Sequence, residues 1–150
     1  MGFSQSSPPK KIKAVLAQKT GDQTIPNNTL TNLTWDDERY DPDGWHDNVT
    51  DNSQFVVPGG VDHLIALVGL STNQVSPAHV GLYVKINGTG YAYQNQGNNQ
   101  NIMLVSPPIP VVEGDVVEFA YWHTFGSSLN VQAGSTGTKS TWAGIIGWKS

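Results

Sequence analysis

The acidic side chains are the most concentrated chemical group in the chain. Loop oxygens of this kind are the ligands that calcium prefers, and Asp41, Asp43 and Asp47 are the candidates to supply them. The run 41–44, Asp-Pro-Asp-Gly, lacks the ligand spacing and terminal Glu of an EF-hand, and the alternative is that these residues cap the backbone of their own turns. We favour turn chemistry and expect no cofactor. The carboxylates are Asp36, Asp37, Glu38, Asp41, Asp43, Asp47 and Asp51.

The sequence contains few residue patterns that are typical of enzyme active sites. A glycosidase needs two carboxylates facing each other across a cleft, whereas these acids crowd one connecting segment. His46, His63, His79 and His123 show no zinc-type spacing. His63 and His123 lie between apolar neighbours and are expected to be core or interface histidines with satisfied hydrogen bonds. A Ser-His-Asp triad stays open, but G-x-S-x-G and the phosphate-binding glycine motifs are absent. We expect no enzymatic activity.

The composition excludes several classes of protein. The 150 residues include eight Lys+Arg and twelve Asp+Glu, giving a net charge of −4 and leaving no basic stripe for nucleic acid. Cysteine is absent, which excludes disulfides, a cysteine zinc site and a thiol nucleophile. No apolar run approaches the roughly 20 residues of a membrane span, and no apolar signal-peptide core opens the chain.

Short strands must position these groups, because sixteen Gly and nine Pro interrupt the chain at short intervals. The clearest strand is 79–87, in which Val80, Leu82, Val84 and Ile86 alternate with other residues before the hairpin signal Asn87-Gly88. A return strand follows at 91–94. This spacing predicts an all-β sandwich or jelly roll. Further strands are expected at 12–19, 29–35, 53–57, 62–70, 102–105, 115–123, 129–133 and 141–148.

Two of these strands, 62–70 and 115–123, carry apolar residues on both faces. A soluble antiparallel sheet normally presents one polar face to water. The second apolar face therefore predicts a covering partner, most economically a neighbouring subunit, with a folded-over loop as the alternative. The candidate interface residues are Ile65, Leu67, Phe119 and Tyr121.

Three motifs in order resemble the complement C-one-q head domain. Residues 55–61, Phe-Val-Val-Pro-Gly-Gly-Val, are similar to its F-x-x-P-x-x-G-x-Y signature, with Val61 where Tyr is usual. Residues 113–117 are similar to its G-D-x-V strand, and residues 142–146 to its closing F-x-G-F-x-L strand.

An upstream block narrows this resemblance to bacteriophage virion proteins of the same superfamily. Residues 25–31 resemble I-x-N-N-T-x-T, and residues 37–41 and 44–47 resemble E-R-x-D and G-x-H-D. The resemblance covers about residues 12–148 and implies a jelly roll of tumour-necrosis-factor type that forms a homotrimer. It also implies a structural role for the recurring loop that contains Glu38, Arg39, Asp41, His46 and Asp47.

The resemblance implies a structural protein at the surface of a phage particle, made in the host cytoplasm. A trimeric capsid decoration, cement or head-spike protein is our first interpretation, and a receptor-binding tip of a tail fibre, recognising a host glycan or surface protein, is the second. Residues 1–10 are expected to form a flexible arm before a single jelly-roll domain at 11–150. Pro8, Pro9, Lys10 and Lys11 are the candidates for attachment to the major capsid protein or another virion protein.

Overall fold

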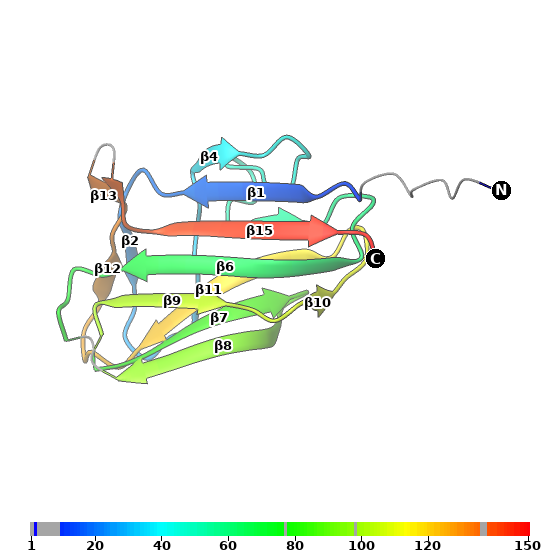
Figure 1. Ribbon diagram of the computed structural model, residues 1–150. Coiled ribbons are helices and arrows are strands. Elements are labelled where there is room, and N and C mark those ends of the chain that lie inside the picture. The colour runs from blue at the N-terminus through cyan, green and yellow to red at the C-terminus, as the bar shows by residue number, and fades with distance from the viewer. Residues whose placement is uncertain (1, 3–9, 77, 98, 136–137) are drawn as a thin grey trace.

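The chain folds into two antiparallel β-sheets packed face to face, as the expected jelly-roll sandwich requires (Figure 1). The computed structural model describes residues 2, 10–76, 78–97, 99–135 and 138–150. Most of the predicted arm, including Pro8 and Pro9, lies outside these residues. Among the described residues no helix is long and apolar enough to cross a membrane.

The first sheet, sheet I, faces the viewer in Figure 1 and runs in the order β10-β6-β15-β1-β4, with β9 on the same edge of β6 as β10. Its centre is β15, which pairs with β1 on one side and β6 on the other. The strands of sheet I are β1 (Lys13–Gln18), β4 (Asp37–Tyr40), β6 (His63–Ser71), β9 (Asn101–Val105), β10 (Ile109–Pro110) and β15 (Trp142–Trp148).

The second sheet, sheet II, lies behind sheet I and runs in the order β3-β11-β7-β8, with β5 pairing the other half of β11. Its strands are β3 (Thr31–Asn32), β5 (Gln54–Val56), β7 (His79–Ile86), β8 (Thr89–Gly97) and β11 (Val116–His123). Two small ribbons complete the fold: β2 (Gln23–Ile25) pairs with β12 (Leu129–Val131), and β13 (Gly134–Ser135) pairs with β14 (Thr138–Lys139).

The tight turn between β7 and β8 forms as the Asn-Gly dipeptide predicts. Asn87 and Gly88 have φ angles of 50° and 79°, the left-handed conformation that a type I′ hairpin requires at both positions. The Asn87 side chain then accepts a hydrogen bond from the Val116 amide (2.9 Å) and donates one to Asp115 (2.9 Å), so the turn is tied to the start of β11.

The acidic segment contains a strand that its composition did not predict. Residues 37–40 were expected to belong to a turn-rich connection, but they form β4, which pairs with Leu16, Ala17 and Gln18 of β1. Backbone pairing with the edge of sheet I outweighs the low strand propensity of Asp and Glu. Charged side chains on such an edge also discourage further strand addition.

An aromatic cluster formed by two strands of sheet II and the segment after β3 lies in the buried core. Phe119 of β11 meets Phe55 of β5 and Trp35 edge-on, with ring centroids 5.7 and 6.0 Å apart. All three side chains are fully buried, as is Tyr121. The prediction that Phe119 and Tyr121 lie at a subunit interface is therefore wrong, because β11 turns them into the core of a single protomer.

The opposite face of β11 is covered within the protomer. Glu118 accepts a hydrogen bond from Asn32 (2.8 Å) and lies 3.4 Å from the ammonium of Lys85, which in turn donates to Asn32 (2.9 Å). Because an ionised side chain is seldom turned into a core, Glu118 was the sequence signal that the alternate set, Phe119 and Tyr121, points inward.

Replacing Phe119 by Ala should lower the free energy of unfolding by about 3–5 kcal/mol, since it removes a fully buried ring from a cluster that cannot collapse around the cavity. Urea denaturation followed by tryptophan fluorescence measures the loss. Tyr40→Ala, an exposed aromatic on β4, is the matched control and should change stability by less than about 1 kcal/mol. Equal losses from the two variants would contradict the core assignment.

Lys19, immediately after β1, is a buried cation. Its ammonium donates to the side chain of Gln23 (2.6 Å) and to the Thr34 carbonyl, and lies 5.3 Å from the centre of the Trp35 ring. Burial lowers the pKa of Lys19 from 10.5 to about 8, because desolvation disfavours the charged form more than Asp36 and Asp22 favour it.

The free energy of unfolding should therefore rise with pH between about 8 and 10, because there the unfolded chain binds the Lys19 proton more tightly than the folded protein does. Urea midpoints across this window measure the rise. Lys19→Met should flatten it, while Lys11→Met, at a side chain that is 78% exposed, should not. A rise that survives in the Lys19 variant would show that another group is responsible.

Candidate interaction surfaces

The outer face of sheet I is apolar, and its residues align in rows across four strands. Ala14, Ile146 and Ile65 form one row. In the next row, Leu16, Gly144, Leu67 and Val105 are neighbours, and in the third the neighbours are Gln18, Trp142, Gly69 and Met103. We call this surface the apolar face: Ala14, Leu16, Ile65, Leu67, Met103, Val105, Trp142, Gly144 and Ile146.

The apolar face is open to solvent at its centre and along β9. Met103, Val105 and Ile146 are 58%, 56% and 43% exposed. Ile65 and Leu67, two of the predicted interface residues, lie half-buried between them. Trp142 lies flat across Gly69, where a Cβ atom would be 3.0 Å from the indole. The surface is contiguous across β1, β15, β6 and β9, with a hollow that Gly69, Met103 and Trp142 help to line. Contiguous exposed apolar area marks interaction sites.

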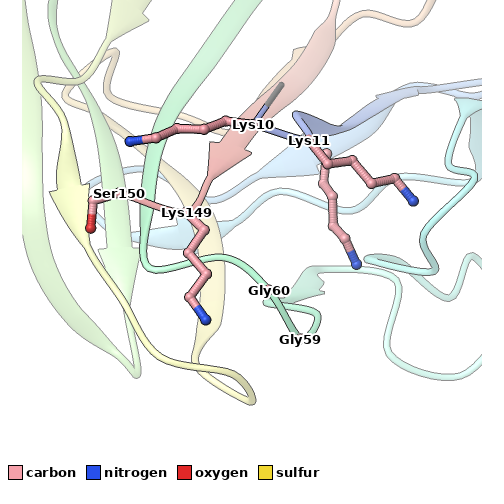
Figure 2. Close-up of a pocket in the computed structure, with 7 residues that line it drawn as sticks. Lys10, Lys11, Gly59, Gly60, Lys149 and Ser150 are labelled. Atoms are coloured by element: carbon pink, nitrogen blue, oxygen red, sulfur yellow. The ribbon is translucent and has the colours of Figure 1, made fainter. Parts of the chain in front are cut away.

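A cavity of about 450 Å³ lies at the end of the sandwich where both chain termini emerge (Figures 1 and 2). Lys10 and Lys11 lead into β1, Lys149 follows β15, and the Gly59-Gly60 turn lies between these segments. We call it the lysine cavity; it is lined by Lys10, Lys11, Lys13, Gly59, Gly60, Lys149 and Ser150.

The charge of the lysine cavity is only partly balanced. Asp43 lies 3.5 Å from the ammonium of Lys13 and 4.0 Å from that of Lys11. Within the described part of the chain, no ion pair engages Lys10 or Lys149. The Glu113 carboxylate borders the rim, 3.3 Å from where a side chain at Gly59 would begin. The arrangement leaves ammonium groups available to an anionic partner.

Asp62 fixes one wall of the lysine cavity. Its carboxylate accepts hydrogen bonds from the Ser150 amide and hydroxyl, both at 2.8 Å, and lies 2.8 Å from His63 Nδ1. The hydrogen bond with His63, followed by that from the Ser150 backbone, lowers the pKa of Asp62 to about 2. Trp148 stacks on the His63 ring, with centroids 6.0 Å apart. These contacts hold Lys149 beside the cavity.

The three calcium candidates have separate structural partners. Asp41 accepts hydrogen bonds from the amides of Trp45 and His46, both at 2.9 Å. Asp43 pairs with the lysines, and Asp47 accepts the amides of Val49 and Thr50. The Val49 amide is the largest cause that lowers the pKa of Asp47. Among the described residues, no three His, Asp or Glu side chains are placed to share a metal ion.

The same segment anchors a buried corner. Glu38 Oε1 lies 3.1 Å from His46 Nδ1 and accepts the Asn48 amide at 3.1 Å. The His46 ring packs against Phe55, with centroids 4.7 Å apart and planes inclined by 33°, and Trp45 is fully buried. These contacts give Glu38, Asp41 and His46 the structural role that the resemblance implied.

The remaining histidines have no shared site. His123 is buried, with Nε2 3.1 Å from the Ile25 carbonyl and Nδ1 accepting the Phe125 amide at 3.2 Å, as expected of a satisfied core histidine. His63 is half-exposed beside Asp62, and His79 is exposed at the start of β7.

Several residues of both surfaces were not predicted from the sequence. Lys149 completes the lysine cavity, and Met103, Val105 and Ile146 complete the apolar face. Strand alternation over 142–148 could have indicated that Ile146 faces outward. In the structure its neighbours Ile145 and Gly147 are both buried, and Ile146 is exposed. Nothing local to Lys149 marked its position next to Lys10, since strand pairing across the whole chain brings the two together.

Comparisons with known proteins place the fold. No family model matches the chain, and no curated protein matches it. Among solved structures, murine APRIL has a TM-score of 0.66 at 9% identity, covering 91% of this chain and 99% of that one. Eiger TNF from S. frugiperda has a TM-score of 0.59 at 8% identity, covering 93% of each chain. PRD1 vertex protein P5 has a TM-score of 0.57 at 15% identity, covering 96% of this chain and 99% of that one. The chain therefore has the TNF-like jelly-roll fold.

Proposed function

We propose that this chain is a structural protein of a bacteriophage particle, a decoration, cement or head-spike protein that assembles as a homotrimer. The observation that carries the proposal is the apolar face of sheet I, which is contiguous across four strands and exposed at Met103, Val105 and Ile146. The likeness to PRD1 vertex protein P5 supports a place in a virion at the level of fold. The proposed role involves no catalysis and no bound cofactor.

Association through the apolar face has a direct physical cause. A single protomer buries the inner face of sheet I against sheet II and leaves the outer face exposed. Removing that apolar surface from water is favourable in proportion to its area. The charged edge strand β4 opposes pairing by strand addition, so contact between sheet faces is the favoured mode. In a cyclic trimer each protomer contacts two neighbours through heterologous interfaces, so the apolar face of every protomer is covered in the same way.

Light scattering of the purified protein should give close to three times 16.2 kDa. The double variant Val105→Lys, Ile146→Lys should be a folded monomer, because it places two charges on the exposed part of the apolar face without altering the core. Val49→Lys, at an apolar residue of the 47–51 segment that is 83% exposed, is the matched control and should remain trimeric. A monomeric wild type at micromolar concentration would contradict the proposal.

The lysine cavity is the proposed attachment surface. Four of the eight basic residues of the chain line it, although the protein carries a net charge of −4. Clustered like charges raise the rate of encounter with an oppositely charged surface and orient the approaching molecule. An acidic capsid surface is the partner that fits. Three copies on one trimer would bind a repetitive lattice with high avidity.

Phage particles that lack this protein should bind the purified protein saturably, and added salt should weaken the binding because it screens the charges. Lys10→Gln, Lys11→Gln and Lys149→Gln together should reduce binding about tenfold or more, because three interfacial charges are lost. Arg39→Gln, a charge removed from exposed β4, is the control and should bind normally.

Binding experiments with the same purified protein also distinguish the particle-attachment interpretation from the receptor-binding and enzymatic ones. Strong binding to host cells that competes with phage adsorption, with none to particles, would favour the receptor-binding interpretation instead. Hydrolysis of a host glycan by the purified protein, lost in Asp47→Asn, would overturn both.

A further inference from the structure

Three tyrosines form an exposed aromatic surface on the outer face of sheet II, the side away from sheet I. Tyr83 and Tyr93 are direct neighbours on β7 and β8, and their rings stack with centroids 5.6 Å apart and planes inclined by 20°. Tyr93 and Tyr91 are 65% and 49% exposed. We call Tyr83, Tyr91 and Tyr93 the tyrosine surface.

Gly81 allows the tyrosine surface to lie flat. A Cβ atom at Gly81 would be 2.9 Å from the Tyr83 ring, so the absence of a side chain leaves room for that ring to lie over the sheet. Trp122 and Asn95 are the cross-strand neighbours of Gly81. The Trp122 indole is held by a hydrogen bond to Asn28 (3.1 Å). Aromatic and amide side chains therefore share one shallow face.

Core packing does not account for these rings. Ala92 is half-buried and packs against the core, while its neighbours Tyr91 and Tyr93 are exposed. A cross-strand aromatic pair is worth only about 0.5–1.5 kcal/mol in stability, and Tyr91 lies outside the stacked pair. Within the described residues, no hydrogen bond engages the hydroxyl groups of the three tyrosines.

The charge of this face selects among partners. Lys85 and Glu118, charged side chains on the described part of this face, neutralise each other at 3.4 Å, and each forms a hydrogen bond with Asn32. Single-stranded nucleic acid also stacks on aromatic side chains, but it requires a positively charged groove. A neutral face of rings, hydroxyls and amides complements a neutral ligand that has one apolar face and several hydroxyl groups, which is the chemistry of a pyranose sugar.

The geometry points to a binding site for a neutral hexopyranose glycan on the tyrosine surface, with sugar rings stacked on Tyr91 and Tyr93 and oriented by Asn95 and the tyrosine hydroxyls. The site goes beyond the proposed attachment function and does not depend on it, because it uses the opposite sheet. Rigid tyrosines lose little conformational entropy on binding. A trimer formed through sheet I would present three such sites outward, which raises the avidity for a polymer.

Titration of the full-length protein with a panel of neutral hexasaccharides of glucose, mannose and galactose tests the site, with binding followed by calorimetry and by NMR signals of the sugar. At least one member should bind. The double variant Tyr91→Ala, Tyr93→Ala should weaken that binding about tenfold or more, because both stacking rings are lost. Tyr40→Ala, an exposed tyrosine on β4, is the matched control and should bind as the wild type does.

No binding by any member of the panel at millimolar protein would overturn the inference, as would equal binding by the Tyr91/Tyr93 variant. Tighter binding of an oligothymidylate than of any sugar would assign the surface to nucleic acid and overturn it as well. Because light scattering reports the trimer separately, failure of this site and failure of the proposed assembly are distinguishable. Far-UV circular dichroism confirms that the variants are folded.

Discussion

A two-layer sandwich buries only one face of each sheet, and this constraint determines what the rest of the molecule does. The inner faces enclose one buried core, which includes the rings of Trp35, Phe55 and Phe119. Each outer face must then be covered internally, remain polar, or bind something. On sheet II, the Lys85–Asn32–Glu118 contacts cover part of the face and the tyrosines occupy the rest. On sheet I no comparable cover exists among the described residues, so Val105 and Ile146 stay open to water.

The acidic segment shows how polar residues support an apolar core. Asp41 and Glu38 hold the backbone and ring of His46, and this places Trp45 beneath β15. Gly147 lies so close to Trp45 that a Cβ atom there would be 2.9 Å from the indole. Asp41 and Asp47, which resemble metal ligands in sequence, therefore accept hydrogen bonds from backbone amides, whereas Asp43 pairs with lysines. Such a long connection contains backbone amides that need acceptors.

Periodicity and turn chemistry were sufficient to predict an all-β sandwich or jelly roll, and the family resemblance narrowed the prediction to a jelly roll of tumour-necrosis-factor type. The strands 79–87 and 115–123 and the Asn87-Gly88 turn follow from alternation and from the left-handed preference of those two residues. Which face of a strand points inward is harder, because both faces of β11 are rich in apolar residues. Phe119 and Tyr121 were placed on the wrong face for that reason. The lysine cavity could be predicted only in part, since Lys10 and Lys149 are brought together by the closing pair of β1 and β15.

Both ends of the described chain leave the sandwich at the same side, beside the lysine cavity, and the Asn87-Gly88 turn lies at that side too (Figure 1). The connection between β6 and β7 lies at the opposite end. If the end of the sandwich with the lysine cavity contacts a phage particle, any sequence fused to either end of this chain would lie between the jelly-roll domain and the particle surface. A foreign peptide inserted between β6 and β7 would instead project outward. The fold is therefore suited to carry cargo on a loop and unsuited to carry it as a tag.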